Sequence, residues 1–200
     1  MRRADQVAEA IAQDIRSGLL GSGAWLKQVD LETRYQASRG DVRRALDILV
    51  VRRLVQQIPD RGFYVLEVDE RRQRELREVR VLLEVGSAAG IVEAATPEIL
   101  DKLTEAAGRF SDAVASGTVV EQYESNHQFH VTLTDLCANR ELVSLIIELR
   151  GNLPATRLRQ WQSVERAKKS ADEHFEMIEA IRRGDVNDLQ NLFRLHIQQP

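Results

Sequence analysis

The sequence predicts a mainly α-helical protein, with a small β-hairpin in its N-terminal part and helices alone in its C-terminal part. Apolar residues recur every three to four positions, the spacing typical of helices, through most of the 200-residue chain. Two short apolar segments flank the turn PDRG at residues 59–62, which favours a hairpin. After residue 68 no strand pattern occurs, and no apolar run approaches the roughly 20 residues of a membrane-spanning helix.

The composition is that of an ordinary globular protein, with 43% hydrophobic and 30% charged residues. The first residues carry charges every few positions and no apolar core, so we expect no secretion signal. Cys137 is the only cysteine, which excludes an intrachain disulfide framework. The sequence therefore predicts a cytoplasmic protein.

The first predicted helix covers residues 3–17, where apolar residues such as Val7 and Ile11 share one face. The stretch SGLLGSG then breaks the helical pattern. Trp25 and Leu26 follow as a short apolar run, which is compatible with a small strand.

Two further helices precede the hairpin. QVDLETRY, residues 28–35, is long enough for a short helix, and QA makes a turn after it. Ser38 is a favourable N-cap for a basic helix over residues 39–54. The order of helix, helix, tight turn, basic helix and hairpin is that of a winged helix-turn-helix.

Positive charge is concentrated in this part of the chain. Residues 34–61 contain seven arginines and three acidic residues, whereas the whole chain has a net charge of −3. A local basic patch on an acidic chain suits a contact with nucleic acid, although solvated helix faces often reach such a small excess.

One long segment carries this order in detail: IRSGLLGSGAWLKQVDLETRYQASRGDVRRALDILVVRRLVQQIPDRGFYV. Its G-x-L, second Gly, SR-x-x-V-R-x-A-L-x-x-L, L-V and R-G-x-x-V resemble the DNA-binding domain of the GntR family of bacterial transcription regulators, over residues 4–66. The resemblance implies a DNA-binding domain over residues 1–68 that reads a palindromic operator of double-stranded DNA as a homodimer. The chain departs from the family at Gly40–Asp41 and at Arg52–Arg53, where an acidic residue and a glycine are usual.

The basic helix and the hairpin tip supply the candidate base contacts. Arg39 and Arg43 are four residues apart, so they point the same way from the helix start that enters the major groove. An arginine there can grip guanine O6 and N7 with two hydrogen bonds. At the wing tip, Gly62 lets the backbone approach closely and Arg61 favours a narrow minor groove.

Backbone contacts are assigned to two other residues. Ser38 can cap its helix and donate to a phosphate, and Arg34 on the preceding helix suits a second phosphate. The competing interpretation is that Arg43 and Arg44 only solvate an exposed helix face. Arg44 and Arg52 are equally compatible with either role.

Residues 69–200 are predicted to form a bundle of about six or seven helices. The resemblance to GntR regulators implies that this bundle binds the ligand and forms the dimer. In the first of these helices, Leu76, Val79 and Leu83 share a face that Gly86 and Ala89 continue. The sequence also predicts three capping residues: Thr96 as an N-cap before Pro97, and Ser170 with Glu173 as a capping box.

Three of the four histidines fall on the apolar faces of three different predicted helices: His130, His174 and His196. Asn126 shares the face of His130, whereas His127 lies at its margin. A lone histidine on such a face is usually an ordinary core residue. Three of them favour a shared divalent metal, because buried imidazole rings need partners for their nitrogens.

The segments RVLLE, AAGIVEAATPE, N-x-x-FH, CANRELVSLI and DEHFEMIEAIRRGD and the final histidine are similar to the effector-binding (FCD) domain of the FadR subfamily, over residues 73–198. The resemblance implies a metal held by the residue four positions before the FH histidine and by three histidines. In this chain these are Asn126, His130, His174 and His196, with Asn126 where the family has Asp. A mainly nitrogen ligand set favours Zn or Ni.

The same resemblance implies that a small carboxylate binds in the bundle and that Arg80 helps to hold it. A salt bridge from Arg80 to Glu84 is the other interpretation, because the two residues are four apart on a helix. Both roles are compatible.

The sequence thus predicts a dimeric, ligand-responsive transcription regulator without enzymatic activity, and more specifically a repressor. One alternative is a metal-dependent hydrolase-like bundle with a DNA-localising domain, for which Glu84 and Glu173 are the candidate general bases. Another is a metal-free bundle that binds the effector directly or serves only for dimerisation.

Overall fold

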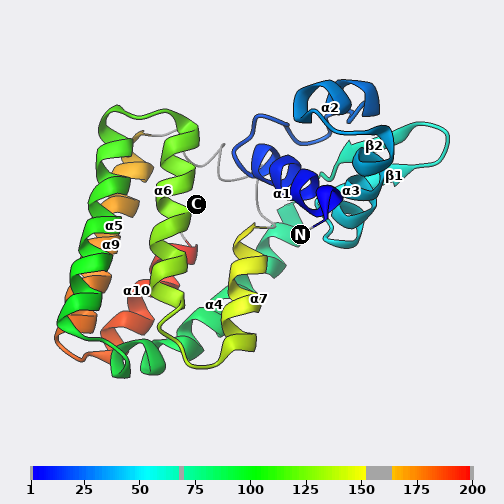
Figure 1. The fold of residues 1–200 in the computed structure, drawn as a ribbon. Helices are drawn as coiled ribbons and strands as arrows, with labels where there is room; N and C mark the ends of the chain where they lie inside the picture. Colours follow the sequence, from blue (N-terminus) through cyan, green and yellow to red (C-terminus); the bar gives the residue numbers. More distant parts are fainter. Residues whose placement is uncertain (1, 68–69, 152–163, 199–200) are drawn as a thin grey trace. The chain divides into compact units, whose positions relative to one another are not determined.

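The computed structural model describes residues 2–67, 70–151 and 164–198, and the chain divides into two compact units (Figure 1). The second unit begins at Glu70. The predicted domain boundary between residues 68 and 69 lies outside the described residues. No helix in the described segments is long and apolar enough to cross a lipid bilayer.

The N-terminal unit is a three-helix domain with a two-stranded wing, as the sequence predicts. The strands pair antiparallel, with Val55 opposite Val65 and Ile58 opposite Gly62. Trp25 forms a single bridge to Tyr64, so the predicted strand there is only a short extension of the wing. The elements are α1 (Arg3–Arg16), α2 (Gln28–Tyr35), α3 (Arg39–Val51), β1 (Val55–Ile58) and β2 (Gly62–Val65).

Both ends of α3 are set by local chemistry. The Ser38 side chain accepts a hydrogen bond from the Asp41 amide, which confirms Ser38 as the N-cap. The helix ends at Val51, three residues before the predicted end, because the chain turns into the left-handed region at Arg53, with φ of 57°. That region suits glycine and is strained for arginine.

The C-terminal unit is built of helices alone within the described residues. Helix α5 lies against α6 and α9, α10 against α4 and α9, and α7 against α4 (Figure 1). Its elements are α4 (Glu70–Glu93), α5 (Pro97–Ser116), α6 (Val119–Thr134), α7 (Arg140–Gly151), α9 (Val164–Arg182) and α10 (Val186–Gln198).

The prediction for the inner face of α4 is wrong for three of its five residues, while Leu76 and Leu83 are partly buried. Val79 is 44% exposed, and Gly86 and Ala89 are also exposed. The buried face instead carries Arg80 and Glu84, together with Ser87, Ala88 and Ile91. Apolar spacing alone does not reveal this face, because its two charged residues are buried and paired with each other, which confirms the predicted salt bridge from Arg80 to Glu84.

The two predicted caps have different outcomes. Thr96 caps α5 with Pro97 in its first turn, as predicted. Ser170 and Glu173 do not form a capping box, since both lie inside α9, which begins at Val164. The Ser-x-x-Glu spacing also occurs in helix interiors, and here Glu173 is buried and serves another purpose.

Candidate functional site

A hollow between the wing and α3 gathers several predicted DNA contacts. Its volume is 400 Å³, and Arg39, Arg61 and Gly62 line it together with Lys27 and Trp25. Gly62 has φ of +95°, and a Cβ there would lie 3.3 Å from Trp25 Nε1, so glycine fits both the turn and the close approach. Residues from the start of α3 and from the wing tip therefore line the same hollow.

Arg43 lies beside this hollow, and its guanidinium contacts Phe63 of the wing. Its guanidinium carbon is 4.9 Å from the centre of the Phe63 ring, and its Nε is 3.5 Å from Asp47 Oδ1. The cation–π contact and the ion pair hold the side chain along the outer face of the helix.

Arg34 has a different setting from the one expected for a phosphate contact. Its Nη2 is 2.7 Å from Asp14 Oδ2, and the Tyr35 hydroxyl donates to the same oxygen at 2.6 Å. Burial and the hydrogen bond to Asp14 raise the pKa of Tyr35 far above its usual value. In the free protein Arg34 therefore ties α2 to α1.

The Ser38 hydroxyl is committed inside its own helix. Its oxygen accepts from the Asp41 amide at 3.2 Å, and its proton is donated to Asp41 Oδ2 at 2.6 Å. The hydrogen bonds from Ser38 and Arg44 lower the pKa of Asp41, so its carboxylate can only accept. A serine has one hydroxyl proton, so in this geometry Ser38 does not also donate to a phosphate.

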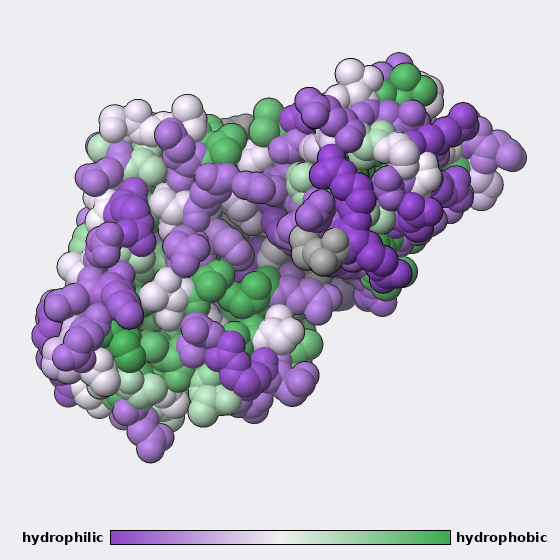
Figure 2. All heavy atoms as spheres, viewed as in Figure 1, coloured by the Kyte–Doolittle hydropathy of each residue, from purple (hydrophilic) through white to green (hydrophobic). Residues whose placement is uncertain are grey.

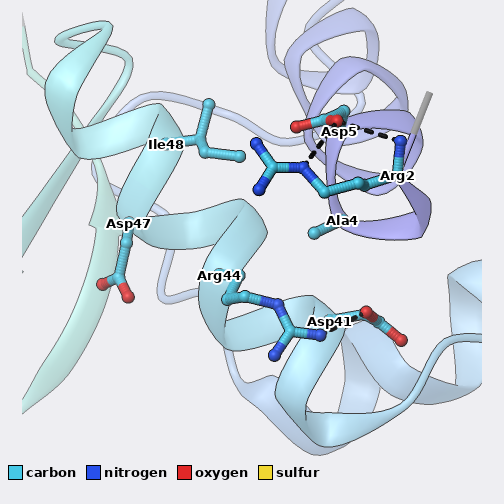
Figure 3. A pocket seen from close by; sticks show the side chains of 7 residues that line it. All are labelled: Arg2, Ala4, Asp5, Asp41, Arg44, Asp47 and Ile48. Carbon is cyan, nitrogen blue, oxygen red and sulfur yellow. Dashed lines mark hydrogen bonds and ion pairs between the residues drawn. The ribbon is translucent and has the colours of Figure 1, made fainter.

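A second hollow in the N-terminal unit, of 570 Å³, lies between α1 and α3 (Figure 3). Arg2 and Arg44 face it, but each is paired with an aspartate, Asp5 and Asp41 respectively. With Asp47 included, three carboxylates line the hollow against two guanidiniums. This charge balance does not favour a bound phosphate.

In the helical unit, three imidazoles from three helices converge on one point. His130 Nε2 of α6 is 3.2 Å from His174 Nε2 of α9 and 3.2 Å from His196 Nε2 of α10. The ligand atoms of all three lie within 4.8 Å of one another. His127 lies outside this cluster, half-buried and stacked on Tyr123, as its place at the margin of the face predicted.

Neighbouring side chains fix the orientation of these rings. The His174 ring stacks on Phe129, with ring centres 3.9 Å apart. His196 Nδ1 is 2.7 Å from Glu173 Oε2. Because a carboxylate only accepts, Nδ1 of His196 carries the proton and Nε2 presents a lone pair to the cluster. Arg166 supports this arrangement, with Nη1 3.5 Å from Glu173 Oε2 and Nη2 donating to the His196 carbonyl.

The electrostatics keep His196 neutral. Burial lowers the pKa of His196 well below its usual value, and the positive charges of Arg150, Arg166 and Arg80 lower it further. A neutral imidazole is the form that ligates a metal.

Asn126 lies one turn before His130 on the buried face of α6. Among the described residues, its buried Oδ1 has no hydrogen-bond partner, which is unusual for a side-chain oxygen inside a protein. An ion bound by imidazole at about 2.0–2.1 Å in a tetrahedral site holds neighbouring nitrogens about 3.3 Å apart. The two 3.2 Å spacings and the unsatisfied oxygen therefore fit a divalent metal with nitrogen-rich ligands.

A buried group of charges adjoins the histidines. Glu84 Oε1 accepts from Arg80 Nε at 2.9 Å, and both of its oxygens accept from Arg150 Nη1, at 2.9 and 2.7 Å. Burial alone would raise the pKa of Glu84, but the charges and hydrogen bonds of Arg150 and Arg80 lower it to about 2. Two guanidiniums surround one carboxylate, which leaves one excess positive charge.

Arg150 is the main residue that the sequence did not reveal. It lies at the end of α7, after a run of apolar residues, and nothing local distinguishes it from a surface arginine at a helix C-terminus. The candidate general bases, Glu84 and Glu173, are held by arginines and by a histidine. Neither is arranged to accept a proton from a water molecule, which argues against the hydrolase alternative.

Sequence profiles of known families match both units. Residues 3–65 match bacterial regulatory proteins of the gntR family, and residues 75–199 match the FCD domain. The uncharacterized HTH-type transcriptional regulator BphR of Paraburkholderia xenovorans is 28% identical over 204 residues, covering 95% of this chain and 80% of BphR. The HTH-type transcriptional repressor RspR of Escherichia coli is 21% identical over 194 residues, covering 97% and 85%.

Solved structures show the same fold. McbR/YncC of E. coli has a TM-score of 0.90 at 22% identity, covering 100% of this chain and 95% of that chain. A putative transcriptional regulator GntR from Rhodococcus sp. RHA1 has a TM-score of 0.84 at 21% identity, covering 98% and 94%. With both units matched to family profiles over most of its length, the chain belongs to the GntR family of bacterial regulatory proteins with an FCD domain, and it is a transcription regulator rather than an enzyme.

Proposed function

We propose that this regulator is a cytoplasmic, ligand-controlled repressor that binds a palindromic operator as a homodimer and senses a small carboxylate in its metal-loaded helical unit. The observation that carries the sensing role is the convergence of three imidazoles beside a buried group of arginines with excess positive charge. Its relative RspR is named a repressor, which supports the direction of control.

The metal ligands in this proposal are His130, His174, His196 and Asn126, with Zn or Ni as the ion because most donors are nitrogen. When bound, the ion supplies a positively charged anchor for a carboxylate group. Asn126 contributes its buried amide oxygen without adding negative charge. Four neutral ligands leave the full 2+ charge in the centre, which increases the demand for an anionic ligand.

The arginines complete the effector site in this proposal. Arg80 and Arg150 already bind one carboxylate, that of Glu84, in a buried setting. Their geometry therefore suits a second carboxylate of an effector, and their excess charge favours it. A small molecule with one carboxylate on the metal and another polar or anionic group near Arg80 and Arg150 satisfies both halves of the site.

For DNA, we assign base contacts to Arg39 and Arg43 and the minor-groove contact to Arg61 with Gly62. The shared hollow of α3 and the wing supports this assignment. Arg34 remains a candidate phosphate contact that would have to exchange Asp14 for DNA. Ser38 acts by capping α3 and presenting its amides, rather than by donating its hydroxyl.

Dimerisation is assigned to the α4–α7 side of the helical unit. Leu82 of α4 is 74% exposed and Leu145 of α7 is 48% exposed, and the two helices pack against each other. Figure 2 shows apolar side chains exposed on the helical unit, which contrasts with the mostly hydrophilic surface of the other unit in that view. Exposed apolar surface of this kind favours association with a second copy.

The test combines DNA binding with a ligand screen. Thermal unfolding of the protein is measured with Zn²⁺ or Ni²⁺ and with each member of a panel of small carboxylates, because a bound ligand raises the unfolding temperature. Compounds that stabilise the metal-loaded protein are then added to band shifts on DNA from the promoter of its own gene. We expect a preferred site whose affinity falls when the carboxylate binds. Binding to random DNA alone, without a preferred site, would overturn the proposal.

The metal-free alternative differs in one measurable respect. Three imidazoles and two arginines could bind a carboxylate directly, and carboxylates would then stabilise the protein equally with and without a chelator. Under our proposal, the chelator abolishes the stabilisation by the carboxylate.

A further inference from the structure

Arg44, the third arginine of α3, forms an ion pair with Asp41 at the start of the helix. Arg44 Nη2 donates to Asp41 Oδ1 at 2.7 Å, so the guanidinium folds back along the helix toward its N-terminus (Figure 3). A Cβ on Gly40 would lie 3.6 Å from Arg44 Nη1 and 3.9 Å from Nη2. The Arg44 guanidinium therefore lies over the bare backbone of Gly40, in the first turn of α3.

We propose that Arg44 is a further base-reading residue of this regulator and that Asp41 is the residue that positions it. The inference rests on the proposed DNA-binding role of α3. The first turn of a recognition helix enters the major groove most deeply, and the backward fold brings the Arg44 guanidinium to that turn.

The helix geometry gives Arg44 a face of its own. Arg39 and Arg43 lie on one stripe, and Gly40 and Arg44 lie on the adjacent stripe, because residues four apart share a face. Arg43 leans over Phe63 of the wing, whereas the Arg44 side chain is 65% exposed. The two stripes thus present guanidiniums to different base pairs of one half-site.

The chemistry of the pair suits recognition of guanine. A guanidinium has five N–H donors, and the Asp41 contact uses one of them on Nη2. Enough donors remain for two hydrogen bonds to guanine O6 and N7. Asp41 limits the rotamers that Arg44 can adopt, and it is itself fixed by the Ser38 hydroxyl at 2.6 Å.

Asp41 also has a second effect, on binding to any DNA sequence. Its carboxylate is ionised and lies on the DNA-facing helix, where it repels phosphates unless Arg44 neutralises it. Removing Arg44 alone therefore combines two losses, the base contact and the neutralisation. Removing the side chains of both Arg44 and Asp41 loses only the base contact, because no carboxylate then remains to be neutralised.

The experiment selects binding sites from a double-stranded library with a randomised core of about 20 base pairs, the length that spans two half-sites. The full-length chain is used as wild type and as Arg44→Ala, Arg44→Lys, Asp41→Ala and Arg44→Ala/Asp41→Ala. Arg53→Gly is the matched control, because it removes one positive charge from the exposed residue just beyond the far end of α3. Affinities are then measured on the selected site and on single-base variants of it.

We expect Arg44→Ala to lose discrimination at one base pair of each half-site by about 5- to 150-fold, with the other positions still read. Arg44→Lys should lose most of that discrimination as well, because lysine cannot make the bidentate contact. Asp41→Ala should bind all sequences more tightly and read the same position less sharply. The double variant should regain affinity for DNA of any sequence, but not the discrimination at that base pair. Arg53→Gly should keep the wild-type sequence preference.

The outcomes separate this inference from the function on which it rests. If the wild type selects no sequence, the proposed operator binding fails and the inference fails with it. If the wild type selects a site that Arg44→Ala and Arg44→Lys read with unchanged preference at every position, Arg44 is not a base-reading residue. Because Arg44 is exposed, its variants are expected to unfold at the wild-type temperature, which circular dichroism checks.

Discussion

Glu173 Oε2 lies 2.7 Å from His196 Nδ1, and this contact links a buried carboxylate of α9 to the histidine cluster. It determines which nitrogen of His196 faces the other two imidazoles. A carboxylate in this place also makes the ring a stronger ligand, as is common around metal-bound histidines.

Glu173→Gln should weaken zinc affinity by about 10- to 100-fold, because the amide still accepts the hydrogen bond but no longer adds negative charge. Competition with a coloured zinc chelator measures the affinity. Glu176→Gln is the matched control, since Glu176 is an exposed residue of the same helix. Equal affinities for the two variants would mean that Glu173 has no influence on a metal.

Glu84→Gln should lower the free energy of unfolding by about 3 kcal/mol at pH 7, which is the energy of a pKa shift from 4.5 to about 2. Glu84 is faced by Arg80 of its own helix, Arg150 of α7 and, electrostatically, His196 of α10. A lowered pKa stabilises the fold above the unfolded-state value near 4.5, and this stabilisation is lost as the pH falls toward 2.

The difference between wild type and Glu84→Gln should therefore narrow as the pH falls from 4.5 to 2. Urea unfolding over this pH range measures it, with Glu93→Gln as the control at an exposed site of the same helix. A difference that stays constant with pH would show that the Glu84 carboxylate gains no stability from its arginines.

Arg53→Gly should raise the free energy of unfolding by about 0.5–1 kcal/mol, because glycine adopts a φ of 57° without the Cβ strain of arginine. The amide of residue 53 keeps its hydrogen bond to the Val50 carbonyl. Arg52→Gly is the contrasting control, because Arg52 has a φ of −73°, in the helical region, and an ion pair with Glu9. The Arg52→Gly variant should therefore be less stable than the wild type. Destabilisation of both variants by the same amount would contradict the strain argument.

Leu82→Lys should convert the proposed homodimer to a monomer, because it places a charge in the apolar surface of α4 that we assign to the interface. Sedimentation velocity measures the oligomeric state at micromolar concentration. Leu195→Lys is the matched control, since Leu195 is a 57% exposed residue of α10 outside the assigned surface. A dimer that persists in Leu82→Lys would place the interface elsewhere.

The sequence predicted the N-terminal unit almost completely, because Ser38, the turn at residues 59–62 and the apolar spacing of α1 and α3 are local signals. It also predicted that His130, His174 and His196 occupy the inner faces of their helices, and those faces are buried or partly buried here. Their convergence depends on three helices packing at one depth, which periodicity alone does not determine.

Of the contacts among the buried charges, the sequence indicates only the salt bridge between Arg80 and Glu84, which are four residues apart on α4. The apolar spacing of α4 still favours Leu76 and Val79 for the buried face, because apolar residues are normally the buried ones. Arg150 satisfies Glu84 from 66 residues away, and no local pattern connects the two. The Ser-x-x-Glu spacing likewise predicts a helix cap at Glu173, because the local sequence does not show that its partner is His196, which lies on another helix.

The most direct test of the metal-dependent sensing role is the metal content of the chain purified without an affinity tag, measured by elemental analysis after dialysis. We predict about one zinc or nickel ion per chain in the wild type, none in His130→Ala, and slower loss to a chelator in Asn126→Asp, because the added carboxylate neutralises part of the ion's charge. Gln128→Glu, at an exposed site on the same helix, should behave as the wild type. Equal metal content in wild type and His130→Ala, or none in either after incubation with zinc, would contradict the account.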